Sequence, residues 1–149
     1  QFDLADRRDP FVAARAATRA VKLDAVDEAR EWLRPFWDRW GELERDGREQ
    51  IALATVTASR GIGSDWLPRL EAAVQSHGHE PAVMLAVGIA FADRQLWGKA
   101  RKMLEQAATA PGLPNPGRRQ AWRALAQLAR DEADDARAQQ CERAAAALD

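Results

Sequence analysis

Alanine content constrains the fold of this chain more than any other feature of its sequence. Of the 149 residues, 32 are alanine, whereas valine, isoleucine and threonine together number only 14. Alanine has the highest helix propensity of the amino acids, and the β-branched residues are those that favour strands. Apolar residues recur at spacings of three and four, and no stretch alternates between apolar and polar residues as a half-buried strand does. The sequence therefore predicts an all-α protein.

The charge balance narrows the class of partner. The chain has 22 lysines and arginines against 23 aspartates and glutamates. This balance leaves no broad basic face for nucleic acid, so we expect no nucleic-acid partner. The single cysteine, Cys141, can form neither an internal disulfide nor a cysteine-based zinc site. No apolar run approaches the ~18–20 residues that span a bilayer, which predicts a soluble domain.

Proline, glycine and polar stretches divide the chain into eight predicted helices. The first two cover about residues 10–21 and 24–40, and Asp24 is expected to cap the second of them. Pro35 lies inside this second helix and predicts a kink or break near Arg34, because proline removes a backbone donor. Ser64 is expected to cap the fourth helix. The remaining helices are expected over residues 48–59, 64–76, 82–93, 96–109, 118–130 and 135–148.

The predicted helices pair into units of similar length. Frames that start at residues 10, 47, 81 and 119 are spaced by 37, 34 and 38 residues. In the frame that starts at Pro81, the small residues Gly88 and Ala100 occupy positions eight and twenty, and the larger Phe91 and Leu104 occupy positions eleven and twenty-four. Small residues at two such positions let the helices of a hairpin cross closely.

This pattern resembles the tetratricopeptide repeat, a helix pair of about 34 residues. The resemblance implies an α-solenoid of about four antiparallel helix hairpins, in a single domain over residues 1–149. The second frame departs from the pattern, because its position twenty is Trp66 where the family has alanine. We therefore expect the second hairpin to be irregular.

Three tryptophans, Trp32, Trp37 and Trp40, form an unusual aromatic group in the first frame. An exposed group of this kind would be an anchor for a partner or a membrane surface. The same three side chains can instead pack the first hairpin against the second. Their helical spacing on an apolar stripe favours this core-packing interpretation.

A narrower resemblance concerns the order of the motifs. The motifs that carry it are Trp66-Leu67, His77, Pro81, Met84-Leu85-Ala86-Val87-Gly88 and Trp97-Gly98-Lys99-Ala100. In this order they are similar to the C-terminal repeat region of the HemY family, proteobacterial inner-membrane proteins associated with heme biosynthesis. The resemblance implies a non-catalytic scaffold for heme-biosynthetic enzymes. It also implies a cytoplasmic domain that is attached to the inner membrane only through an anchor N-terminal to this region.

The tetratricopeptide resemblance further implies a binding surface. In that family the first helix of each repeat lines a concave groove through positions two, five, nine, twelve and thirteen. Applied to the last three frames, these positions predict a partner-binding groove. Its residues are Arg48, Ile51, Thr55, Ala58 and Ser59, then Ala82, Leu85, Ile89, Ala92 and Asp93, then Gln120, Arg123, Gln127, Arg130 and Asp131.

Two arginines on the predicted helix over residues 118–130 indicate that the partner presents an acidic segment. Arg123 and Arg130 are seven residues apart, so both side chains point the same way from one helix. Asp131 partly neutralises Arg130, which leaves Arg123 as the better anchor for a carboxylate. Unpaired terminal hairpins also stack in arrays of this kind, so a homo-oligomer is a further expectation.

His77 and His79 lie in a connection between two predicted helices. Imidazole ligates metals and heme, which gives an alternative function as a heme or porphyrin carrier. The favoured interpretation is a solvated loop, in which His77 stabilises the C-terminal end of the preceding helix, so no cofactor is expected. No Ser–His–acid set, paired-carboxylate cleft or phosphate loop can be placed, so an enzyme is not expected.

Overall fold

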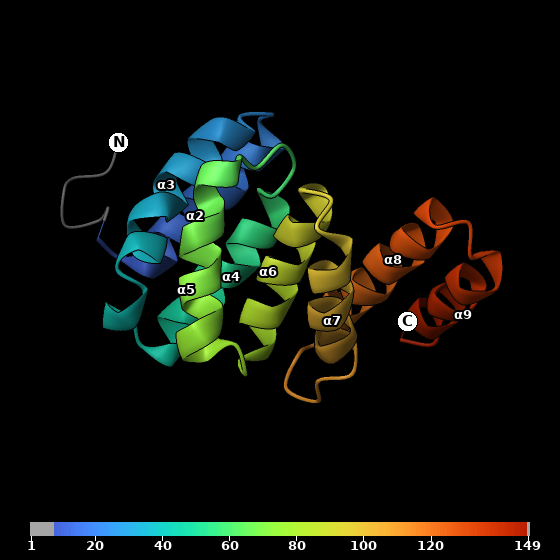
Figure 1. Ribbon diagram of the computed structural model, residues 1–149. Helices are drawn as coiled ribbons and strands as arrows, with labels where there is room; N and C mark the ends of the chain where they lie inside the picture. Colours follow the sequence, from blue (N-terminus) through green and yellow to red (C-terminus); the bar gives the residue numbers. More distant parts are fainter. Residues whose placement is uncertain (1–7, 149) are drawn as a thin grey trace.

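A computed structural model describes residues 8–148, and all regular structure in them is helical (Figure 1). This confirms the predicted all-α class. No helix within this range is both long enough and apolar enough to cross a membrane. The α-helices are α2 (Pro10–Lys22), α3 (Val26–Asp38), α4 (Arg45–Thr57), α5 (Leu67–His77), α6 (Pro81–Asp93), α7 (Trp97–Ala108), α8 (Asn115–Asp131) and α9 (Asp135–Ala146). Two short 3-10 helices are η1 (Trp40–Glu42) and η2 (Ser64–Trp66).

The helices follow one another across the molecule, from α2 and α3 at one end to α8 and α9 at the other (Figure 1). Each of α2, α6 and α8 packs on the helix that follows it, and α7 packs on α8. The first helices of the frames also meet directly, because α4 packs on both α2 and α6. The second frame differs: α5 packs on α6 and α3 rather than on α4.

Alanine occupies the places where these helices meet. The four buried residues of α2 are Ala13, Ala14, Ala17 and Ala20. Ala100 and Ala107 are fully buried in α7. Because a methyl group adds little bulk, the helix axes can approach closely at these residues. The alanine content that predicts helices therefore also sets how they pack.

Four turns share one backbone feature. Among residues 8–148, φ is positive at Asp24, Gly61, Gln95 and Ala133, which are spaced by 37, 34 and 38 residues. After α2, α6 and α8, the residue that follows the positive-φ position donates its amide hydrogen to the carbonyl of the residue five positions earlier, as in a Schellman motif. These bonds run from Ala25 to Ala20 (2.8 Å), from Leu96 to Phe91 (2.9 Å) and from Asp134 to Ala129 (2.8 Å). The turn after α4 differs, since the Ile62 amide donates to the Ser59 carbonyl (3.0 Å).

Three tryptophans, Trp37, Trp40 and Trp66, form a cluster next to the start of α5. The Trp37 ring stacks on Trp40 with centroids 4.3 Å apart, and Trp66 meets it edge-on at 6.4 Å. The Trp37 indole N–H donates to the Thr55 hydroxyl at 3.0 Å. Trp66 directly precedes α5, so the cluster joins the start of α5 to α3 and α4. Trp37 and Trp40 are buried, which confirms core packing for both of them, and Trp32 is half-buried.

The two predicted N-caps are wrong. Asp24 occupies the positive-φ position of the turn after α2, and α3 begins at Val26 without a side-chain cap. Ser64 begins η2, so α5 begins only at Leu67. In both places the residue that the sequence suggests as an N-cap, Asp24 or Ser64, belongs instead to the turn or short helix that precedes the α-helix.

Of the kink or break predicted near Arg34, the break does not occur, because α3 continues through Pro35 to Asp38. The neighbouring Leu33, Phe36 and Trp37 are buried, so packing holds the helix across the one missing backbone hydrogen bond. Two other helices begin earlier than predicted. α4 starts at Arg45, and α8 starts inside the proline-rich segment at Asn115, with Pro116 in its first turn.

Candidate functional site

The structure buries six of the ten residues of the predicted groove that come from the second and third frames. Thr55, Ser59 and Leu85 are at most 3% exposed, so they cannot contact a partner, which corrects the prediction for these residues. Ile51, Ala58 and Ala82 are buried as well. The physical reason is the direct packing of α4 on α2 and α6, which places these side chains in the core.

Arg48 is half-buried, and its guanidinium makes hydrogen bonds within the fold. Its guanidinium forks onto the buried Glu80, with Nε at 2.9 Å from Oε1 and Nη2 at 2.7 Å from Oε2. Its Nη1 also donates to the Leu43 carbonyl. The hydrogen bonds from Arg48 hold the pKa of Glu80 below its ordinary value. The pair therefore fastens the start of α4 to the start of α6.

The remaining predicted residues reach the surface on α6 and α8. Ile89 is half-buried, and the carboxylate of the exposed Asp93 accepts a hydrogen bond from the Gly61 amide at 3.1 Å. Gln120, Arg123, Gln127 and Arg130 are all exposed on α8.

Arg123 is the better placed of the two predicted arginine anchors. Arg130 forms an ion pair with Glu142 of α9 and donates to Gln127. The expected neutralisation of Arg130 therefore comes from Glu142, whereas Asp131 accepts a hydrogen bond from Gln127. Arg123 makes no ion pair with any residue in the described range.

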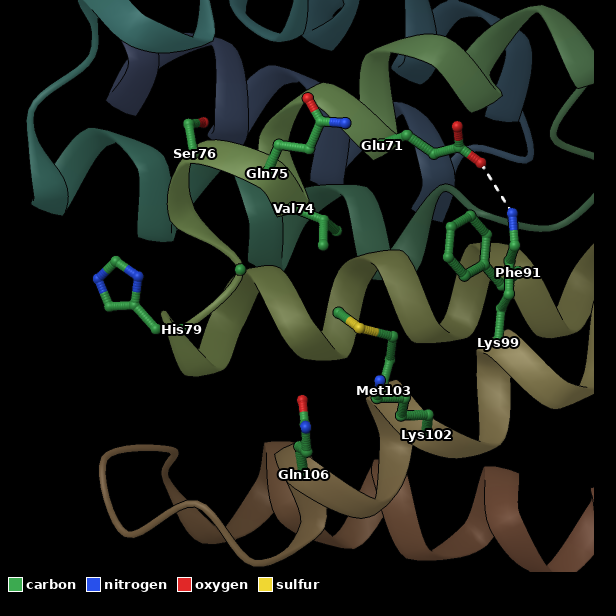
Figure 2. A pocket seen from close by; sticks show the side chains of 11 residues that line it. Glu71, Val74, Gln75, Ser76, His79, Phe91, Lys99, Lys102, Met103 and Gln106 are labelled. Carbon is green, nitrogen blue, oxygen red and sulfur yellow. Dashed lines mark hydrogen bonds and ion pairs between the residues drawn. The ribbon is translucent and has the colours of Figure 1, made fainter.

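A groove of about 630 Å³ lies between α5 and α7, with α6 as its floor (Figure 2). We call it the α5–α7 groove. Val74, Phe91 and Met103 supply its apolar part. Its other lining residues are Glu71, Gln75, Ser76, Gly78, His79, Lys99, Lys102 and Gln106. This volume lies in the range of about 300–1,000 Å³ that small-molecule sites occupy.

Charge in the α5–α7 groove is partly neutralised. Lys99 reaches across from α7 to the Glu71 carboxylate at 3.1 Å (Figure 2). The Lys99 ammonium also lies 5.7 Å from the centroid of the Phe91 ring. Lys102 is exposed and is the cation that the groove leaves available for an anionic group.

His79 lies in the α5–α7 groove, whereas His77 lies at the end of α5 and outside the groove lining. The Nδ1 atom of His77 lies 2.8 Å from the Ser76 hydroxyl. The imidazole centroids are 6.4 Å apart. No group of three or more His, Cys, Asp or Glu side chains in residues 8–148 is arranged to hold a metal ion.

A second groove, of about 440 Å³, lies between α2 and α4 and was not predicted. Three cations, Arg15, Arg19 and Lys22, line it. Their spacing of four and three residues places them on one face of α2, and this pattern is visible in the sequence. The predicted groove was assigned from the last three frames only, so the first helix was left out.

Comparison of the chain with family models, with curated proteins and with solved structures finds no significant match in any of the three.

Proposed function

We propose that this chain is a non-catalytic protein-interaction scaffold, built as an α-solenoid of four tetratricopeptide-like helix hairpins. The observation that carries the proposal is the position of the four positive-φ residues. Asp24 is the fifteenth residue counted from Pro10, and Gly61, Gln95 and Ala133 are the fifteenth from residues 47, 81 and 119. A repeated hairpin requires one equivalent turn in each frame, and the frames come from the side-chain pattern alone.

Ion pairs between neighbouring frames give further support. Glu71 of α5 pairs with Lys99 of α7, and Glu105 of α7 pairs with Arg137 of α9. In both pairs the acid is the twenty-fifth residue of its frame and the base is the nineteenth of the next. Exposed pairs contribute little stability. Their recurrence at equivalent positions of neighbouring frames supports a regular stack of hairpins.

The binding surface of this scaffold is proposed to include Arg123. Its guanidinium is exposed and can fork onto a carboxylate of the partner, so the proposed partner presents an acidic segment to α8. The HemY-like motif order suggests heme-biosynthetic enzymes as that partner. A helical-repeat surface suits an extended or helical peptide, since consecutive helices offer side chains over a long distance.

The test is capture of partners from proteobacterial membrane extracts on the immobilised chain, with quantitative mass spectrometry. Wild type is expected to retain a specific protein, and Arg123→Glu is expected to retain several-fold less of it, with an effect that shrinks as salt is raised. Arg143→Glu is the matched control, because Arg143 is an exposed arginine on α9. Equal retention by wild type and Arg123→Glu would remove Arg123 from the binding surface.

One observation favours the alternative function, a heme or porphyrin carrier. His79 shares the α5–α7 groove with Met103 and with the cation Lys102, which could face a carboxylate of a porphyrin. The imidazole is exposed rather than held in the interior, so we expect a heme titration of the chain to give no tight Soret shift. A tight shift that His79→Ala abolishes would replace the scaffold proposal by the carrier.

A further inference from the structure

We propose that the groove between α2 and α4 binds an acidic, amphipathic peptide segment of a partner protein. This basic groove, as we call it, is lined by Ala14, Arg15, Thr18, Arg19, Lys22, Gln50, Leu53 and Ala54. It lies on α2 and α4, whereas Arg123 belongs to α8, toward the other end of the molecule (Figure 1), so the two are separate sites. The inference rests on the proposed function only in taking the chain to be an interaction module.

The charge of the basic groove is unbalanced. Arg15, Arg19 and Lys22 are exposed, and no carboxylate among residues 8–148 lines the groove. None of the three makes an ion pair with a residue in the described range. Other arginines of the described range, such as Arg123, are also without an ion pair, but the basic groove brings three such cations together on one helix. The arginines that do pair with carboxylates are Arg30, Arg34, Arg48, Arg69, Arg101, Arg130 and Arg137. Three unpaired cations on one face of a helix favour an anionic ligand.

The groove also has an apolar part. Ala14 and Ala54 line its wall, and the half-buried Leu53 projects from α4 beside them. Two large apolar side chains, Phe11 (43% exposed) and Leu23 (68% exposed), lie near the two ends of α2. They are the exposed large hydrophobic residues of the described range. An occupant that covers α2 would therefore bury apolar surface along with its charges.

The lining favours a peptide over nucleic acid. Within the described part of the chain, no aromatic ring lines the groove, whereas proteins that bind single strands stack bases on aromatic side chains. The guanidinium groups of Arg15 and Arg19 can instead each bind a carboxylate through two parallel hydrogen bonds. A groove between two packed helices also matches the known docking of amphipathic helices and extended segments.

The experiment uses a fluorescently labelled peptide of alternating glutamate and leucine, with fluorescence anisotropy on the full chain. We expect saturable binding that weakens as salt is raised. The double variant Arg15→Glu/Arg19→Glu should weaken binding by at least about tenfold, because attraction becomes repulsion at two positions. The neutral variant Arg15→Gln/Arg19→Gln should fall between it and wild type. Far-ultraviolet circular dichroism checks that each variant keeps its helical content.

Two controls isolate the groove. Arg143→Glu removes one exposed arginine from α9 and should leave the affinity unchanged. A peptide with every glutamate replaced by glutamine should bind several-fold more weakly, because the ion pairs are lost. Equal affinity of wild type and the Arg15→Glu/Arg19→Glu variant would overturn the inference. So would a single-stranded oligonucleotide or an anionic lipid vesicle that binds more tightly than the peptide with the same arginine dependence.

The variant Arg123→Glu separates this inference from the proposed function. It should leave peptide affinity at the basic groove unchanged. If Arg123→Glu abolishes peptide binding while the Arg15→Glu/Arg19→Glu variant does not, the basic groove is not a peptide site and Arg123 remains one. If partner capture from membranes fails but the peptide binds as described, the scaffold proposal fails and the groove stands.

Discussion

At the scale of single residues, the hydrogen side chain of Gly88 sets how closely α6 and α7 approach. A Cβ atom at this position would lie 2.9 Å from Cγ and Cδ2 of Leu104, and 3.3 Å from Cβ of Met103. The sequence frame pairs Gly88 with Ala100 at this crossing. The structure instead gives Leu104 as the side chain that faces Gly88, one helical turn further along α7.

We predict that Gly88→Leu lowers the free energy of unfolding by roughly 1–3 kcal/mol or more, because the core has no space for the added side chain. Urea denaturation of wild type and variant measures the difference. Gly98→Leu is the matched control, since nothing lies within 4 Å of a Cβ at Gly98. An unchanged urea midpoint for Gly88→Leu would mean that the α6–α7 contact is looser than described.

At the scale of helices, the Arg48–Glu80 pair joins two elements that do not follow each other in the chain. The Glu80 pKa is lowered from its ordinary value of 4.5, first by the hydrogen bonds from Arg48. A carboxyl whose pKa is lower in the folded state stabilises that state above the unfolded pKa. This contribution is lost as pH falls from about 4.5 through the lowered folded value.

We predict that Glu80→Gln destabilises the protein by about 2–4 kcal/mol at neutral pH, because it leaves the Arg48 guanidinium without its carboxylate. The variant should also lose part of the acid-induced decrease in stability. Urea titrations at several pH values between 7 and about 3 measure both effects. The control Glu71→Gln breaks the exposed pair with Lys99 and should cost less than about 1 kcal/mol. Parallel pH profiles for wild type and Glu80→Gln would contradict the prediction.

The sequence identifies the helices better than their ends or their faces. Helical spacing and alanine content predict each α-helix of the described range, because both signals are local. The starts of α4 and α8 depend on neighbours: Gly47 lies inside α4 against the ring of Pro10, a contact that local propensity does not contain. The non-glycine residues Asp24 and Gln95 at positive φ carry no turn signal of the kind that glycine gives.

The binding residues could be predicted only in part, since their exposure depends on the tertiary arrangement. Positions carried over from a regular repeat assume that every hairpin closes in the same way. On α8 the predicted Arg123 and Gln127 are exposed. At Thr55 of α4 and at Ser59 just beyond its end the assumption fails, because α2 and α6 cover this helix and the Trp37 indole donates a hydrogen bond to Thr55.

At the scale of the whole molecule, the helices differ in how many neighbours support them. α6 packs on α4, α5, α7 and α8, whereas α9 packs mainly on α8. Buried residues of α9 are Ala138, Cys141 and Ala145, so this helix buries little apolar surface. A helix that packs mainly on one neighbour and buries little apolar surface opens more readily than one that is packed on several sides.

We therefore predict that backbone amides of α9 exchange with deuterium faster than those of α6 under native conditions. Hydrogen exchange followed by mass spectrometry on the full chain measures the difference. Protection of α9 equal to that of α6 would show that the chain unfolds as one cooperative unit. The comparison of α7 with α6 is the internal reference, because these two helices pack directly on each other.

The tryptophan cluster has a consequence for how such a chain can be lengthened. Trp37 and Trp40 of the first frame pack with Trp66 of the second, so replacing either frame alone would leave part of this cluster without its partner. The joint between α7 and α8 is crossed instead by partly exposed ion pairs, Arg101 with Glu132 and Glu105 with Arg137. The Glu105–Arg137 pair is equivalent to the Glu71–Lys99 pair of the preceding frame. A duplicated copy of α6 and α7 placed at that joint would meet familiar neighbours on both sides. On the proposed repeat arrangement, an added helix pair should therefore fit more easily between α7 and α8 than between the first two frames.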